Sequence, residues 1–154
     1  MKWVSNMSKS IYDYCKEFKR KFPGTISWRM KQHCSIVEKH LNDDEVVLYA
    51  FCAQRNERWH EIFFTSVFVF TNKRMMLGRK GLVGNYTFTT ITPDMFNDLK
   101  VSSGLFFGKV KIDTIKELVV LTDISKKALP EIYAKVSNYM TFMKKKYMKD
   151  KENE

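Results

Sequence analysis

The chain lacks any long uninterrupted apolar run. Its longest runs are 46–53 and 67–70, far shorter than the roughly 20 residues that a membrane-spanning helix needs. The first ten residues contain a lysine but neither an apolar core nor a small-residue cleavage site, so the sequence predicts no secretory signal. We therefore expect a soluble, cytoplasmic protein, with peripheral contact at the inner face of the membrane as the alternative.

Cysteine is also scarce, since the chain has only Cys15, Cys34 and Cys52, far apart in the sequence. This odd, dispersed set argues against a disulfide framework and favours reduced thiols packed as small apolar groups. His33 and His40 flank Cys34, but they lie seven residues apart on one predicted helix, and a metal there would need a ligand from elsewhere. We predict neither a metal nor a cofactor.

Recognisable catalytic motifs are missing as well. His60, Thr65 and Ser66 supply an imidazole and two hydroxyls, but no nucleophile elbow and no acid partner accompany them. The glycine-containing segment 80–85 joins two predicted strands instead of opening a helix, which is where a phosphate-binding loop would lie. The sequence therefore favours a protein that is not an enzyme.

A period-2 apolar pattern fills the middle of the chain. It predicts about seven strands separated by turn signals, the clearest of them at 109–114, where apolar and charged residues alternate. Asn72 and Lys73 form a short turn between two of these strands, because asparagine tolerates the positive φ of a tight hairpin. The predicted strands are 46–53, 62–70, 74–79, 86–91, 97–101, 109–114 and 117–122.

A 3.6-residue apolar pattern appears on both sides of the strands. Two amphipathic helices are predicted first, one from about Ser8 to the stop at Pro23-Gly24, and one from a cap at Thr25 or Ser27 to Leu41. Their apolar faces could pack on the sheet, on each other or on a second copy of the chain. The last helix begins near 123–125, with Pro130 in its first turn.

These patterns predict a mainly β protein of the α+β class. Its core is a bent antiparallel sheet or small barrel of about seven strands, capped by a C-terminal helix and preceded by two N-terminal helices. We divide the chain into a helical extension at 1–41, a sheet domain with its capping helix at 42–147, and a charged tail at 148–154. The length of 154 residues and the 44% hydrophobic content suit one domain of this kind.

Three segments and the terminal helix resemble the bacterial pleckstrin-homology (PH) domains of the YokE-like type. The segments are EVVLYAFCA at 45–53, FVFTNKRMML at 68–77 and the stretch 89–113, and the hairpin with Thr71 and Arg74 is the most specific of them. The resemblance covers about 42–147 and leaves the first helix outside. It implies a seven-stranded, strongly bent sheet capped by one helix, and it implies little about chemistry, because one fold hosts many functions.

The first candidate site follows the first predicted strand, where Arg55, Arg58 and Trp59 could hold an anionic group. The resemblance supports this edge, because eukaryotic PH domains bind phosphoinositide headgroups there. Those relatives carry a lysine near the end of the first strand and a basic pair on the second, however, whereas this chain has Cys52 and the apolar stretch 63–65. The alternative is a set of solvated loop charges.

The second candidate is the lysine tract at the end of the last helix. The net charge of +10 is spread evenly along the chain, and this tract is one of two local clusters, with 18–21 as the other. The tract could lie on an anionic leaflet or on nucleic-acid phosphates, or could be a solvated helix end. Its basic residues are Lys144, Lys145, Lys146 and Lys149.

The function that the sequence favours is that of a non-enzymatic PH-like binding module. It would act through contacts with an unknown protein partner, through self-association, or at an anionic membrane surface. The alternative is a nucleic-acid-binding protein that uses its basic surface, as the pI near 9.5 suggests. That alternative is weaker, because aromatic residues such as Phe64, Phe68 and Phe70 fall at core positions and leave no evident stacking platform.

Overall fold

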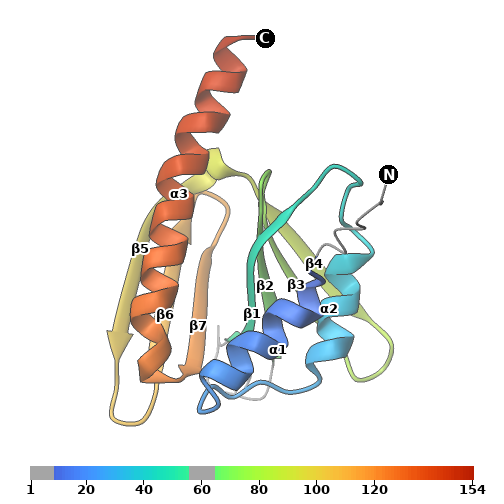
Figure 1. Ribbon diagram of the computed structural model, residues 1–154, viewed down its shortest axis with the longest axis vertical. Helices are drawn as coiled ribbons and strands as arrows, with labels where there is room; N and C mark the ends of the chain where they lie inside the picture. Colours follow the sequence, from blue (N-terminus) through green and yellow to red (C-terminus); the bar gives the residue numbers. More distant parts are fainter. Residues whose placement is uncertain (1–8, 56–64) are drawn as a thin grey trace, which may run out of the picture.

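The structure, a computed structural model, describes residues 9–55 and 65–154. Seven antiparallel strands form one curled sheet in the order β4-β3-β2-β1-β7-β6-β5, with three helices packed on it (Figure 1). This arrangement confirms the predicted fold class. The helices are α1 (Ile11–Lys21), α2 (Met30–Glu38) and α3 (Leu129–Glu152), and the strands are β1 (Val47–Arg55), β2 (Thr65–Thr71), β3 (Met75–Lys80), β4 (Tyr86–Ile91), β5 (Phe96–Ser103), β6 (Gly108–Thr114) and β7 (Leu118–Ile124).

In the half of the sheet made by β1 to β4, the first three strands are largely buried on both faces, while the edge strand β4 is exposed or half-buried along most of its length. Every residue of β2 is buried, and its side chains alternate between two apolar clusters. Phe68 and Phe70 join the inner cluster, while Val67 and Val69 join an outer cluster under α1 and α2. A strand with two covered faces buries successive side chains on opposite sides, which explains the unbroken apolar run at 67–70.

The N-terminal helices supply that outer cover, so their apolar faces pack on the sheet. Ser10 begins α1 with a capping box, in which its side chain accepts from the Asp13 amide at 3.1 Å. Cys15 in α1 is buried in the outer cluster, whereas Phe18, one turn later, stacks on Phe51 of the inner cluster with ring centroids 5.0 Å apart. Helix α1 therefore contacts both apolar clusters.

Helix α2 begins later than the sequence predicted. It starts at Met30, after Arg29, and no side chain caps it, so the caps proposed at Thr25 and Ser27 were wrong. The segment before it is held by other parts of the chain instead. The amide of Ile26 donates to the Asp123 carbonyl at 2.9 Å, and the amide of Trp28 donates to Thr65 Oγ1 at 2.8 Å. These contacts hold the segment against β7 and β2, outside the helix.

The other half of the sheet, β5 to β7, is covered by α3 on one face. Burial along β6 alternates strictly, with Lys109, Lys111 and Asp113 exposed. Pro130 lies in the first turn of α3, as predicted, and the helix continues to Glu152, past the predicted start of the charged tail. Helix α3 buries an apolar stripe against the sheet: Leu129, Ile132, Val136, Tyr139 and Met143.

The apolar phases of the predicted strands and of the last helix place nine residues in one core, and the structure confirms this for the members that it describes. Six of its members lie in the inner cluster, and Met140 packs against it, partly buried. Ile62 and Phe64, the other two predicted members, lie outside the described residues. The six buried members are Phe68, Phe70, Val110, Ile112, Ile132 and Val136.

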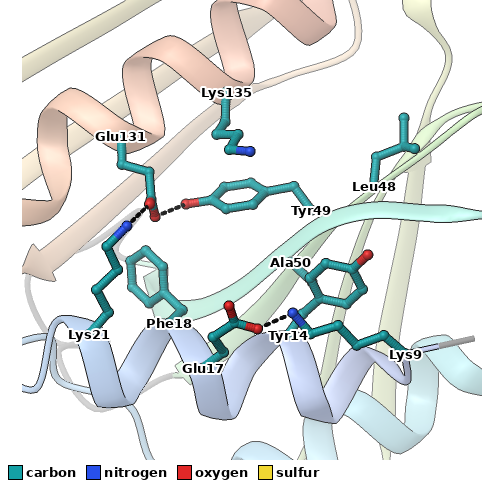
Figure 2. A pocket seen from close by; sticks show the side chains of 10 residues that line it. All are labelled: Lys9, Tyr14, Glu17, Phe18, Lys21, Leu48, Tyr49, Ala50, Glu131 and Lys135. Atoms are coloured by element: carbon teal, nitrogen blue, oxygen red, sulfur yellow. Dashed lines mark hydrogen bonds and ion pairs between the residues drawn. The ribbon is translucent and has the colours of Figure 1, made fainter.

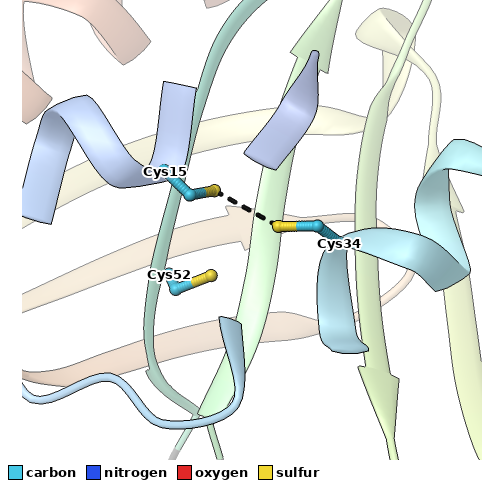
Figure 3. A group of neighbouring side chains, drawn as sticks. All are labelled: Cys15, Cys34 and Cys52. Carbon is cyan, nitrogen blue, oxygen red and sulfur yellow. Dashed lines mark hydrogen bonds between the residues drawn. The ribbon is translucent and has the colours of Figure 1, made fainter. Parts of the chain in front are cut away.

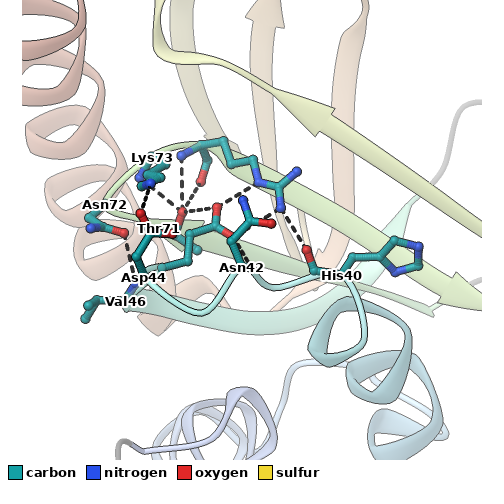
Figure 4. Close-up of polar contacts among 9 residues, drawn as sticks. His40, Asn42, Asp44, Val46, Thr71, Asn72 and Lys73 are labelled. Carbon is teal, nitrogen blue, oxygen red and sulfur yellow. Dashed lines mark hydrogen bonds and ion pairs between the residues drawn. The ribbon is translucent and has the colours of Figure 1, made fainter. Parts of the chain in front are cut away.

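The hairpin at 71–74 has a polar network that accounts for its sequence (Figure 4). Thr71 donates its amide to the Arg74 carbonyl at 3.0 Å, and the Arg74 Nε donates to Glu45 Oε1 at 2.7 Å. The second Arg74 nitrogen, Nη2, donates to the His40 carbonyl at 2.8 Å. Burial raises the pKa of Glu45, but the hydrogen bonds from Arg74, the Asn42 amide and Thr71 outweigh it and leave this pKa below its ordinary value.

Candidate functional site

One end of the molecule carries the β3–β4 and β5–β6 turns and the connection between α1 and α2 (lower end of Figure 1). We call this the turn end and define it by residues 25–29, 79–86, 102–109 and 123–127. The four segments come from distant parts of the sequence, so the fold alone brings them to one end.

Large apolar side chains protrude from the turn end. Leu82 and Val83 in the β3–β4 turn are 72% and 90% exposed, and Leu105 and Phe106 in the β5–β6 turn are 80% and 77% exposed. Trp28, between the two helices, is 57% exposed. Turns normally carry small polar residues, and single exposed apolar residues are common on protein surfaces. Two neighbouring apolar residues at each of two turns, on one end of the molecule, are unusual and mark a candidate contact surface.

Hydrogen bonds hold the segments of the turn end together. The Ser125 amide donates to Thr25 Oγ1 at 3.0 Å, and the Lys126 ammonium donates to the Leu105 carbonyl at 2.6 Å. On the other side, a small hollow of about 80 Å³ is lined by Trp28 and Leu82, among other residues. The segment 25–28 therefore bridges the two turns.

The charge of the turn end is positive. The sequence has no aspartate or glutamate at 18–37, 62–93 or 99–112, which are the stretches that form three of its four segments. Asp123 is the acidic residue of the fourth segment, and the basic residues of the turn end outnumber it. The basic residues of the turn end are Arg29, Arg79, Lys80, Lys109, Lys126 and Lys127.

The backbone at this end is strained at two positions. Among the residues that the structure describes, Arg29 and Asp123 are the non-glycine residues with positive φ, at 53° and 56°. A left-handed conformation costs an L-residue about 1–2 kcal/mol, and such strain tends to collect at functional sites. Arg29 directly follows the segment 25–28, and Asp123 accepts from the Ile26 amide of that segment.

His33 connects α2 to the turn end. Its Nδ1 accepts from the Lys80 amide at 3.0 Å, which requires the unprotonated nitrogen. Burial, and then the positive charge of Arg29, lower the pKa of His33 to about 4. The imidazole is therefore neutral at pH 7 and fixes the start of the β3–β4 turn.

Of the first predicted site, the structure describes Arg55. Arg55 ends β1, and its Nη2 donates to Glu117 Oε2 at 2.8 Å. This ion pair lies beside Thr114, because the Glu117 amide donates to Thr114 Oγ1 at 2.9 Å. Arg58 and Trp59 lie outside the described residues, so their part in this site stays a prediction.

The second predicted site, the lysine tract, lies near the end of α3. Lys144 donates to the Phe96 carbonyl at 2.9 Å, and Phe96 pairs with Thr114 in the sheet. Lys144 thus lies beside the ends of β5 and β6 that are farthest from the β5–β6 turn, whereas Gln54, next to Arg55, donates to the Ile26 carbonyl of the turn end at 3.4 Å. Lys145, Lys146 and Lys149 are exposed.

A cavity of about 180 Å³ lies between α1 and α3 (Figure 2). Its charged side chains largely partner one another. Lys9 pairs with Glu17, Lys21 pairs with Glu131, and the Tyr49 hydroxyl donates to Glu131 at 3.2 Å. This balance of charge leaves little with which to hold an ionic ligand, so we place no site there.

Sequence reasoning missed the turn end because it judged each turn separately. The signal was present, since the apolar pairs at 82–83 and 105–106 interrupt glycine-containing turns and lie in stretches without acidic residues.

Within the described residues, no helix combines the length and the apolar character that crossing a membrane requires.

Comparison with known proteins gives matches to pleckstrin-homology domains. A family model described as "Bacterial PH domain" matches residues 41–138. The chain is also similar to the crystal structure of a pleckstrin-homology domain from Shewanella amazonensis, with 21% identity, a TM-score of 0.50, and coverage of 70% of this chain and 94% of that one. A second structure, of a protein with a pleckstrin-homology domain from Shewanella loihica, has 17% identity and a TM-score of 0.46, with coverage of 74% and 99%. No curated protein matches.

Proposed function

Because the chain belongs to the bacterial PH domain family, whose fold supports a binding module, we propose that it binds an anionic membrane surface through its turn end. The observation that carries the proposal is the combination of two protruding apolar pairs, at 82–83 and 105–106, with surrounding basic residues. The family is generally non-enzymatic, which agrees with this role.

The physical argument rests on the layered chemistry of a bilayer surface. Apolar turn residues that enter the boundary between headgroups and acyl chains gain about 0.8 kcal/mol for each buried CH₂ group. Lysines and arginines beside them stay among anionic headgroups, where each contributes about 1 kcal/mol. Leu82, Val83, Leu105 and Phe106 would supply the first contribution, and Lys80, Lys109 and Lys126 are among the residues that would supply the second.

The same layering separates this proposal from nucleic-acid binding. Phosphate backbones attract lysine and arginine in the same way, but aliphatic side chains such as Leu82, Val83 and Leu105 find no apolar layer there. Binding to single strands relies on aromatic stacking. Phe68 and Phe70 are buried, and Trp28 and Phe106 are the exposed aromatic side chains of the turn end beside three aliphatic ones.

Vesicle sedimentation tests the proposal. Binding to anionic phosphatidylserine-containing vesicles should exceed binding to neutral phosphatidylcholine vesicles and should weaken as salt rises. The variant L82S/V83S/L105S/F106S should lose most of this binding. Its stability should change by only a few tenths of a kcal/mol per site, because the four side chains are exposed.

The matched control is K144Q/K145Q/K146Q, which removes three charges from the lysine tract and leaves the turn end intact. We expect it to keep most vesicle binding. Loss of binding in this variant, with binding retained in the fourfold serine variant, would assign the membrane contact to the tract. Absence of binding by the parent chain at low salt would refute the membrane proposal and leave protein partners, and a DNA titration run beside it measures the nucleic-acid alternative.

A further inference from the structure

The three cysteines converge in the folded chain (Figure 3). Cys15 comes from α1, Cys34 from α2 and Cys52 from β1, and their Sγ atoms all lie within 4.8 Å of one another. The Cys15 and Cys34 sulfurs are 3.6 Å apart. All three residues are buried. The sequence predicted three separate thiols packed as apolar groups, and their meeting was not foreseen.

The spacing of the three sulfurs matches that of a trigonal metal site. Metal–sulfur bonds of about 2.3 Å that point to the corners of a triangle place the sulfurs about 4 Å apart. The separations here, 3.6 Å for one pair and no more than 4.8 Å for any pair, require shifts of less than about 1 Å to reach that arrangement. We propose that Cys15, Cys34 and Cys52 form a three-coordinate thiolate site for Cu(I).

The donor set decides which metal fits. Among the described residues, no histidine, aspartate or glutamate joins the three cysteines. Structural zinc sites take four ligands in a tetrahedron, whereas an all-sulfur set is soft and suits Cu(I). Met76 belongs to the surrounding apolar cluster and is not one of the proposed ligands.

The surroundings of the site are apolar and closed. Ile11, Val37, Ala50 and Val67 belong to the same cluster, and they exclude water and competing oxygen ligands. The thiols must lose protons when a metal binds.

Plain apolar packing and a disulfide would each use the three cysteines differently from a metal. Apolar packing needs three small side chains but does not need sulfur. A disulfide needs two sulfurs, and it would leave the third cysteine without a role. A metal uses all three, and because they come from α1, α2 and β1, a bound ion would fasten both N-terminal helices to the sheet.

A competition titration tests the site on the full-length, reduced protein without oxygen. Cu(I) is titrated against a coloured Cu(I) chelator, with Zn(II) as a second probe. We expect one equivalent of Cu(I) to be bound, each single Cys→Ala variant to bind at least tenfold more weakly, and the unfolding temperature of the parent to rise on loading. The matched control, Met76→Leu, removes a neighbouring sulfur at similar volume and should bind as the parent does.

The variants are first checked for folding by circular dichroism, and any that fails is replaced by the Cys→Ser change at that position. Binding by Cys15→Ala, Cys34→Ala and Cys52→Ala equal to that of the parent would overturn the proposal. So would a failure of the parent to compete with the chelator, or tighter binding of Zn(II) than of Cu(I). One further result would overturn the proposal: a parent protein that does not retain Cu(I) but forms a Cys15–Cys34 disulfide under mild oxidation. That result would assign the two cysteines to redox chemistry.

Discussion

The two halves of the sheet differ in the number of layers that pack on them. The β1–β4 half lies between the inner core and the N-terminal helices, so β2 is buried along its whole length. The β5–β7 half has α3 on one face only, so β6 alternates between buried and exposed residues. One sheet can therefore contain both a strand with an unbroken apolar run and a strand in which apolar and polar residues alternate. The first pattern indicates that both faces of the strand are covered, and the second that one face is covered.

The contact between the two halves of the sheet is made largely by side chains, because few backbone pairs connect them. Within the described residues, β1 pairs with β7 only through Gln54 and Arg55. Phe18 of α1 packs on Phe51 beside this junction, and Lys21 of α1 pairs with Glu131 of α3. Helix α1 thus contributes to both halves, although the resemblance to known PH domains did not include it.

The largest expected effect comes from removing the outer layer. A chain that starts at Thr25 loses Ile11, Cys15, Phe18 and Phe22, which are all buried, and it exposes the outer face of β1 and β2. We expect a loss of stability greater than that of any single substitution, measured by urea unfolding, with light scattering to report self-association. A shortened chain as stable as the parent would show that the N-terminal layer is dispensable, and the comparison between the halves would fail.

A large effect is also expected at the centre of the inner core. Phe68 is fully buried, so Phe68→Ala should lower the free energy of unfolding by about 3–5 kcal/mol. In the other half, the milder change Ile112→Val should cost only about 0.5–1.5 kcal/mol. Chemical denaturation gives both values, and a loss below about 1 kcal/mol for Phe68→Ala would contradict its place in the core.

A matched pair of substitutions probes the outer faces directly. Val69 on β2 faces the outer cluster, so Val69→Thr buries a hydroxyl there and should cost about 1–3 kcal/mol. Lys111 on β6 faces solvent, and Lys111→Thr should change stability by less than about 0.5 kcal/mol. Equal costs at the two sites would mean that the two outer faces do not differ in cover.

The smallest effect concerns pH and is confined to the covered half, since β5–β7 contain no histidine. The pKa of His33 is lowered from 6.5 to about 4 in the folded chain, so its contribution to stability is present above pH 6.5 and declines as the pH falls toward 4. Between pH 7.5 and pH 6 the loss from this group should stay below about 1 kcal/mol. Comparing the pH dependence of unfolding in His33→Gln and the parent isolates it, and identical slopes would exclude this role.

The sequence predicted most of the fold because its signals are local. Alternation predicted 109–114, and proline predicted the first turn of α3. The hairpin at 72–73 is present, but without the positive φ expected of Asn72, since Arg29 and Asp123 are the described non-glycine residues with positive φ. The start of α2 was not predictable in this way, because the contact that replaces its cap joins Thr25 to Ser125, a hundred residues away. The cysteine cluster and the turn end escaped for the same reason, since each is assembled from segments that are distant in the sequence.

The length of helix α3 separates the lysine tract from the basic residues of the turn end, and this separation has an electrostatic consequence. Its 24 residues extend over about 36 Å at 1.5 Å per residue, and it runs away from the turn end toward the opposite end of the molecule (Figure 1). Screening lengths in physiological salt are about 8 Å, so the potential of the basic residues at the turn end has decayed before it reaches the lysine tract. The two groups of positive charge therefore act as independent sites, each with its own salt dependence, and their substitutions should add without coupling.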